Sequence, residues 1–309
     1  MYDKIENIGI SAMAVACSSR KSKLPMPLLQ AESLPRGTQR VVAKEWIARL
    51  RGVPKINLVQ ARDLYLGRSY LRTRTLSEEF GCSLFILSAG LGLVGEKTSV
   101  PSYNLTVSSS ASQALHERVR PFLVPPVWWN AMQSGPFASP MSLLCNESGR
   151  ILVALTQSYA EMVGPSLAAL PLSQRAQLRI LGFGLRPSGL SLRLHPQVMV
   201  YDARLDSVIP GTGMDAVSRA LTHFANLVRN VPMQSPREDQ RLIDDALDII
   251  EFPSSPMRIR VNDVTLMQHV RKLAKDGLTS SGALRRLRDE MGIACEEKRF
   301  RRMYGEVCL

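Results

Sequence analysis

A single thiol beside two cations is the most reactive feature of the sequence. Cys17 directly follows the apolar run 8–16, and Arg20 and Lys21 come three and four residues after it. Nearby cations favour the thiolate, which is the nucleophilic form of cysteine. Because the apolar run predicts a buried strand, we expect the thiol at the carboxyl edge of a sheet. Alternatively, Cys17 is a small buried hydrophobic residue, the usual role of a free cysteine.

Three segments of the first third share one layout. Residues 16–21, 63–68 and 86–93 each join a polar or glycine turn to an apolar run, and 101–104 adds Pro-Ser-Tyr-Asn after the third. Loops at the carboxyl ends of strands are where α/β proteins bind their ligands. The sequence therefore predicts that the three segments meet at one site.

Alternating strand and helix patterns predict the scaffold that positions these loops. Strand-like runs occupy 8–16, 83–87, 151–155, 177–183 and 190–208, and helical patterns occupy 41–50, 112–123, 157–170, 215–228 and a basic stretch after 67. We expect an α/β catalytic domain over residues 1–235, with a mixed sheet flanked by helices. Breaks at 232–236 and 254–256 precede a small basic helical module over residues 236–309, with helices near 265–275, 282–291 (capped by Ser280 and Ser281) and 296–307.

Positive charge is the second strong signal of the sequence. The 309 residues carry a formal net charge of +12, and the stretch from Arg258 onward has five more basic than acidic residues. Such an excess attracts a polyanion and favours nucleic acid as a partner. The alternative is a basic enzyme that binds no polyanion.

Several classes of protein are not expected. The longest uncharged stretch, roughly 119–146, is interrupted by Arg120 and prolines, so we expect no membrane contact, and without a signal sequence a cytoplasmic protein. The five cysteines have unrelated spacings, which argues against a disulfide framework. No histidine lies at metal-ligand spacing from another histidine or cysteine, so we expect no metal and no other cofactor.

The three segments resemble motifs of the YaaA-like superfamily, also called the DUF328-type family. Tyr65-Leu66-Gly67 matches its YxG element, and 87–93 with 101–103 matches its LSGLYGLL…PY element, although Leu91-Gly92 stands where many relatives have Leu-Tyr-Gly. Residues 17–21 are similar to the start of the related domain of archaeosine synthases, which act on the nitrile of 7-cyano-7-deazaguanine in tRNA. Within the superfamily the chain is most similar to the DpdC family of bacterial 7-deazaguanine DNA-modification systems. The last fifty residues match no pattern of the family.

The resemblance implies a reaction and assigns roles in it. A Cys17 thiolate would add to the nitrile carbon of 7-cyano-7-deazaguanine in DNA, and water would convert the thioimidate to the amide. Lys21 would donate a proton to the imidate nitrogen or contact a phosphate. Asp63 would act as general base or bind the base edge, unless it caps a helix or pairs with Arg62 or Arg68.

Other residues of the loops are candidate substrate contacts. Backbone N–H groups of the serines could bind an anion or the side chains could cap a helix, a tyrosine could stack on a base or lie in the core, and glycines let a ligand approach the backbone. The expected set is Ser18, Ser19, Tyr65, Gly67, Ser88, Gly90, Gly92, Tyr103 and Asn104.

Two groups of cations are candidate contacts to nucleic-acid phosphates, because basic helices can follow a phosphate backbone. The first group is Arg20, Lys23, Arg68, Arg72 and Arg74, and the second is Arg285, Arg286, Arg288, Lys298, Arg299, Arg301 and Arg302. Either group could instead form a solvated face. Trp128-Trp129 could stack on an extruded base, but a tryptophan pair beside prolines more often anchors a core.

The sequence thus predicts an enzyme that hydrates the nitrile of 7-cyano-7-deazaguanine in DNA, acting with other proteins of a DNA-modification system. The first alternative is a non-enzymatic YaaA-like protein that binds DNA and protects against stress. A third interpretation is an amidotransferase-like or tRNA-directed enzyme.

Overall fold

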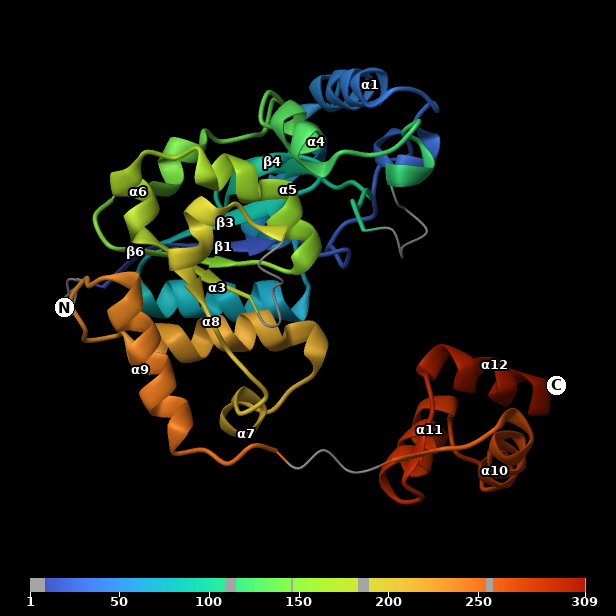
Figure 1. Ribbon diagram of the computed structural model, residues 1–309. Coiled ribbons are helices and arrows are strands. Elements are labelled where there is room, and N and C mark those ends of the chain that lie inside the picture. Colours follow the sequence, from blue (N-terminus) through green and yellow to red (C-terminus); the bar gives the residue numbers. More distant parts are fainter. Residues whose placement is uncertain (1–8, 109–114, 146, 183–188, 254–257, 309) are drawn as a thin grey trace. The chain divides into compact units, whose positions relative to one another are not determined.

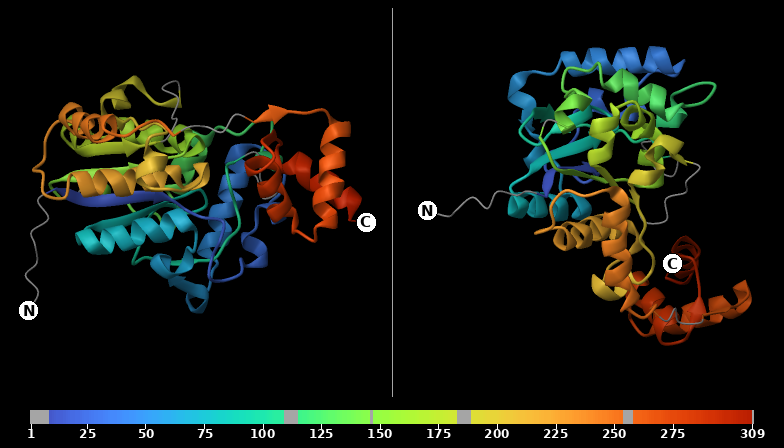
Figure 2. Two further views of the ribbon diagram at one scale, coloured as in Figure 1. Left: turned by 90° about the horizontal axis from the view of Figure 1, so that it is seen from below. Right: turned by 60° about the vertical axis from the view of Figure 1, so that its left-hand side comes forward.

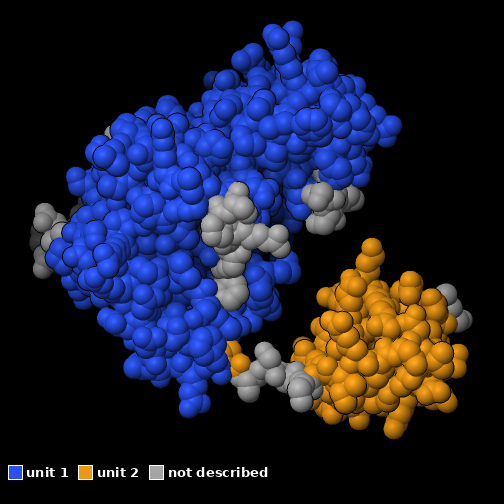
Figure 3. Space-filling model, in the orientation of Figure 1, with its two compact units in different colours: residues 1–252 blue, residues 253–309 orange. Residues whose placement is uncertain are grey.

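The computed structural model describes residues 9–108, 115–145, 147–182, 189–253 and 258–308. The chain divides into two compact units (Figure 3), unit 1 over residues 1–252 and unit 2 over residues 253–309. The expected break at 254–256 lies outside the described residues, as do Ile8 and Phe183, the ends of two expected strands.

A six-stranded mixed sheet forms the centre of unit 1, with the order β4-β3-β1-β6-β7-β8. Neighbouring strands are parallel except for β4, which is antiparallel to β3. The central strand β1 is almost completely buried, as expected for a parallel strand covered on both faces. The strands are β1 (Ile10–Ala16), β3 (Ser83–Ser88), β4 (Gly92–Gly95), β6 (Arg150–Ala154), β7 (Leu178–Leu181) and β8 (Val198–Met199).

Helices cover both faces of this sheet (Figures 1 and 2), which confirms the predicted α/β class with a mixed sheet flanked by helices. One face carries α3 (Arg68–Phe80) and α8 (Ala216–Leu227), and the other carries α4 (Pro125–Met132) and α5 (Gln157–Ala168), with α1 (Gln39–Arg51) beside α4. In α8 the buried residues Ala220, Leu221, Phe224 and Ala225 recur at helical spacing, so one apolar stripe faces the sheet.

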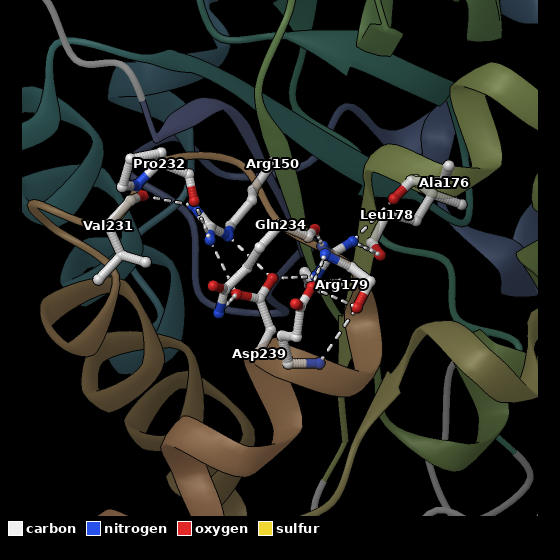
Figure 4. Close-up of polar contacts among 10 residues, drawn as sticks. Arg150, Ala176, Leu178, Arg179, Val231, Pro232, Gln234 and Asp239 are labelled. Atoms are coloured by element: carbon white, nitrogen blue, oxygen red, sulfur yellow. Dashed lines mark hydrogen bonds and ion pairs between the residues drawn. The ribbon is translucent and has the colours of Figure 1, made fainter.

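Two buried arginines fasten α9 (Pro236–Asp248) to the amino ends of β6 and β7 (Figure 4). The guanidinium groups of Arg150 and Arg179 both donate to the carboxylate of Asp239, and all three side chains are fully buried. Arg150 also donates to the carbonyls of Val231 and Pro232. The expected domain boundary after residue 235 is therefore wrong: α9 belongs to unit 1, and the units divide after Phe252.

Unit 2 has its own small apolar core, in which Leu266, Leu284, Leu287 and Phe300 are buried. It consists of β9 (Ile259–Arg260), α10 (Asp263–Lys275), α11 (Ser280–Asp289), β10 (Ile293–Ala294) and α12 (Glu297–Val307), and β9 pairs with β10 in parallel. The hydroxyl of Thr279 caps α11, so Ser280 and Ser281 belong to the helix and are not its caps as expected.

The remaining elements of unit 1 are short. They are the antiparallel pair β2 (Leu58–Gln60) and β5 (Ser99–Pro101), and the helices α2 (Ala61–Leu64), α6 (Leu172–Gln177) and α7 (Leu205–Val208). Two predictions fail here. The expected helix 112–123 is only a 3-10 turn at Leu115–Glu117, its first three residues being outside the described part, and the run 190–208 forms a 3-10 helix before the short β8. No described helix is long and apolar enough to cross a membrane.

Candidate active site

Cys17 lies at the centre of the carboxyl edge of the sheet. It is the first residue after β1, and its backbone N–H donates to the carbonyl of Leu87 at the end of β3. Since β3 and β6 flank β1 on opposite sides, the chain reverses its direction of strand addition here, and such switch points open a crevice. A pocket of about 580 Å³ lies at this point, lined by the ends of β1 and β6 and by the partly buried Cys17.

The hydroxyl of Tyr159, in the first turn of α5, lies 3.1 Å from Sγ of Cys17, and both residues line the pocket. Burial, and after it the proximity of Cys17, raises the pKa of Tyr159 well above its ordinary value. The phenol therefore stays protonated at neutral pH. It can donate a hydrogen bond to a thiolate, an interaction stronger than a hydrogen bond between neutral groups.

The first two predicted segments pack directly against each other and form one wall. The hydroxyl of Ser18 accepts from the N–H of Gly67 at 3.0 Å and donates to the carbonyl of Arg20 at 2.8 Å. A Cβ at Gly67 would lie 2.4 Å from Cβ of Ser18, so only glycine fits this contact. The structure thus brings Cys17, Ser18, Ser19, Arg20, Gly67 and Arg68 together around the pocket, as predicted.

Three helices begin at the pocket, which makes it a positive environment. Gly67, Thr156 and Asp215 are the N-cap residues of α3, α5 and α8, and all three line it. Neither Gly67 nor Thr156 caps its helix with a side chain, so N–H groups of the first turns of α3 and α5 are left for other acceptors. Helix amino ends attract anions, and Arg20 and Arg68 add positive charge to the lining.

Asp215 is a buried carboxylate of the pocket that the sequence analysis did not select. Its oxygens accept from the backbone N–H and the hydroxyl of Thr212, and lie 3.3–3.9 Å from the guanidinium groups of Arg68, Arg72 and Arg219. Burial works to raise the pKa of Asp215, but the hydrogen bonds from Thr212 and the arginine charges outweigh burial and lower it. Asp215 is therefore an ionised anchor for Arg68 and Arg72.

Lys21 is not among the described residues that line the pocket. Its ammonium group donates to the carbonyl of Ser18 at 3.0 Å and lies 4.4 Å from the centre of the Tyr103 ring. Burial lowers the pKa of Lys21, whereas the charge of Cys17 works to raise it. Lys21 thus supports the 17–20 loop from outside the pocket, through its hydrogen bond to Ser18.

Tyr65 of the second predicted segment and the whole of the third segment are not among the described residues that line the pocket. Tyr65, Ser88 and Tyr103 are fully or almost fully buried, and the Tyr103 hydroxyl lies 3.2 Å from that of Tyr65 and 2.6 Å from that of Ser88. None of the three is among the described residues that line the pocket. This corrects the expectation that these three residues contact substrate.

The two glycines of that segment also serve packing. A Cβ at Gly90 would lie 2.7 Å from the Tyr103 ring, and Gly92 has a positive φ of 83° that strains any other residue. The backbone of Asn104 forms hydrogen bonds with the backbone of Leu29 and of Ala31. Gly90, Gly92 and Asn104 are likewise absent from the described lining, so the structure does not bring them to the substrate pocket.

The structure does not bring Asp63 to the pocket, where it was expected to act as general base or to bind the base edge. Its exposed carboxylate lies 3.9 Å from Arg74 and 4.0 Å from Arg62, and among the described residues it does not line the pocket. Asp63 follows the short β2 and lies in α2. The alternative of a surface ion pair is the one that the structure supports.

The cations of the first predicted group divide between the pocket and the surface. Arg74 pairs with Glu78 and donates to the carbonyl of Arg62, Arg72 pairs with Asp215, and Lys23 is exposed. In unit 2, three of the second group carry neither an ion pair nor a side-chain hydrogen bond among the described residues: Arg285, Lys298 and Arg302. The others are engaged with acidic side chains or a carbonyl: Arg286, Arg288, Arg299 and Arg301.

The tryptophan pair is part of the core, as the second interpretation expected. Trp128 and Trp129 are fully buried, and the indole N–H of Trp128 donates to the carbonyl of Ala89. Trp46 donates to the carbonyl of Gly90. The indoles of Trp46 and Trp128 thus fix the backbone of the third segment.

Among the described residues no group of three or more histidine, cysteine or acidic side chains could hold a metal ion.

Tyr159, Thr156 and Asp215 are the site residues that sequence reasoning missed. Thr156 follows a strand-like run as Cys17 does, which was the available signal, but only the strand order shows that β6 lies beside β1.

A scan against models of protein families, a search of curated proteins and a search of solved structures each found no match. The resemblance to the YaaA-like superfamily therefore stays a prediction from three short motifs.

Proposed function

We propose that this protein hydrates the nitrile of 7-cyano-7-deazaguanine in DNA to the amide, with Cys17 as the nucleophile. The observation that carries the proposal is the Cys17 thiol, 3.1 Å from the Tyr159 hydroxyl, in the wall of a pocket of about 580 Å³. A volume of this order is typical of small-molecule sites and suits a single extruded base. The choice of the nitrile rests on the motif resemblance.

The reaction needs a nucleophile and a proton donor at one place. The thiolate of Cys17 forms a C–S bond to the nitrile carbon, and the nitrile nitrogen takes a proton, which the Tyr159 hydroxyl is placed to donate. Water then adds to the thioimidate carbon: one of its protons passes to the nitrogen and the other returns to the Tyr159 oxygen, and the C–S bond breaks with sulfur leaving as thiolate. The nitrogen is retained, so the base gains one water and the enzyme is regenerated.

The charges around the pocket suit a substrate that is part of a polyanion. Arg20 and Arg68 line it, and the amino ends of α3 and α5 add partial positive charge. A flipped nucleotide carries phosphates on both sides, and these cations favour their approach. In this proposal the protein acts in the cytoplasm within a DNA-modification system.

The test is direct. Incubation of the protein with DNA that contains 7-cyano-7-deazaguanine, followed by digestion to nucleosides and mass spectrometry, should show the gain of one water on the modified nucleoside. Cys17→Ser should abolish turnover. Cys82→Ser is the matched control, because Cys82 is partly buried outside the pocket and burial raises its pKa to about 12.

Other outcomes would overturn the proposal. Unchanged nucleoside in the presence of bound DNA would support the non-enzymatic DNA-binding alternative. Turnover of the same base only in tRNA would support the tRNA-directed enzyme. Equal turnover by Cys17→Ser would exclude the thiol as nucleophile.

A further inference from the structure

Unit 2 contains a cavity whose walls are rich in arginine. Its volume is about 320 Å³, and Arg258, Arg285, Arg288 and Arg301 line it together with Ser280 and Ser281 at the start of α11. Two carboxylates, Asp289 and Glu297, also line it. Four guanidinium groups against two carboxylates leave the lining with an excess of two positive charges. Such an excess suits a phosphate group.

Contacts within unit 2 hold three of these arginines in place. Arg258 donates to the carbonyl of Arg288 at 3.0 Å and to Asp289 at 2.9 Å. Arg288 donates twice to the carbonyl of Cys295, at 2.7 and 3.1 Å, and Arg301 lies 2.6 Å from Glu297. A guanidinium group has five N–H donors in a fixed plane, so one that is held on one side still offers donors on another.

Two polar groups of the lining have no partner among the described residues. Arg285 is exposed and carries no ion pair or hydrogen bond there, and the hydroxyl oxygen of Ser280 is enclosed without a hydrogen bond. Arginine binds phosphate oxygens through paired, charge-assisted hydrogen bonds. A phosphate in the cavity would give Arg285 the acceptor that it lacks.

We propose that this cavity binds a backbone phosphate of DNA and that Arg285 is its principal contact. The proposal selects one built site within the basic cluster of the C-terminal module. Of the seven cations of that cluster, three are among the described residues that line the cavity: Arg285, Arg288 and Arg301. It concerns unmodified DNA and does not depend on the chemistry at Cys17.

The test uses the full chain and an unmodified 20-base-pair duplex, with affinity measured by fluorescence anisotropy at several salt concentrations. Arg285→Gln should weaken binding about tenfold and reduce the slope of log affinity against log salt by about one. Arg271→Gln is the matched control, because this substitution removes the same charge at an exposed residue of α10 that is not in the described lining of the cavity. It should change affinity less than about threefold.

Three results would overturn the proposal. Equal weakening by both variants would mean that only total charge matters, and unchanged binding by Arg285→Gln would mean that DNA does not occupy the cavity. If a duplex RNA of equal length bound more tightly and alone responded to Arg285→Gln, the ligand would be RNA. Failure at this cavity and failure at the thiol are distinguishable, because the anisotropy of the unmodified duplex measures binding alone, whereas the nucleoside assay measures hydration of the modified base.

Discussion

Gly67 leaves room for the loop that carries the candidate nucleophile. Ser18 fills the space that a side chain at position 67 would need, because a Cβ at that position would lie 2.4 Å from Cβ of Ser18. We expect Gly67→Ala to displace the 17–20 loop and to cost about 1–3 kcal/mol of unfolding free energy, as overpacking does. Denaturant unfolding monitored by circular dichroism measures this loss, and alkylation of Cys17 by iodoacetamide should change its rate.

A double-mutant cycle separates this contact from general damage. Ser18→Gly removes the opposing Cβ, together with two hydrogen bonds of Ser18, and should cost roughly 1–2 kcal/mol by itself. The double variant Gly67→Ala/Ser18→Gly should be more stable than the sum of the single losses predicts. Strictly additive losses would show that the two positions do not compete for space.

At the scale of single residues, the sequence predicted those parts of the pocket whose residues are neighbours in the chain or share a motif. Cys17 and Gly67 were expected together because each belongs to one of the three short segments, and both line the pocket. Tyr159 could not be selected, since its hydroxyl reaches Cys17 only through the pairing of β1 with β6. Asp63 was wrongly selected as a site residue because it lies close in the chain to Tyr65, which belongs to the matching motif. Its own carboxylate lies on the surface.

At the scale of elements, α9 depends on one buried carboxylate. Asp239→Asn keeps the size of the side chain but leaves Arg150 and Arg179 without a negative partner in a fully buried place. Breaking a buried ion pair by neutralising one partner costs about 3–5 kcal/mol. We expect this loss in denaturant unfolding of the full chain, with the first effect on α9 as seen by hydrogen exchange.

The matched control for Asp239→Asn is Asp63→Asn, which makes the same chemical change in an exposed pair. Surface ion pairs contribute about 0–1 kcal/mol, so this variant should unfold near the midpoint of the unaltered chain. A loss of similar size at both positions would mean that burial of the Arg150–Asp239–Arg179 cluster does not govern its energy.

Element types were largely predictable, but their grouping was not. The apolar periodicity of α8 and the continuous apolar run of β1 reflect burial on one face and on two faces, which a sequence records directly. The proline-containing stretch 232–236 resembles a linker by composition. The carbonyls of Pro232 and Gln234 instead accept hydrogen bonds from Arg150 and Arg179. These contacts join residues more than fifty positions apart, which no local pattern records.

For the whole molecule, the boundary between the units leads to a prediction about truncated chains. A chain that ends at residue 252 keeps every residue of unit 1, and we expect it to unfold cooperatively with the core of that unit intact. A chain that ends at residue 235 lacks Asp239 and leaves two guanidinium groups buried without a counter-charge. Desolvating an unpaired charge is costly, so the shorter chain should be expanded or insoluble.

Purification of both truncated chains, followed by near-ultraviolet circular dichroism and denaturant unfolding, measures the difference. The chain 1–252 should retain the signal of the buried tryptophans Trp46, Trp128 and Trp129, and the chain 1–235 should lose it. Restoring solubility to the shorter chain by replacing both Arg150 and Arg179 with methionine would trace the failure to the unpaired charges. If the chain 1–235 unfolded at the same denaturant midpoint as 1–252, α9 would be an appendage of the sheet and the predicted boundary after residue 235 would be restored.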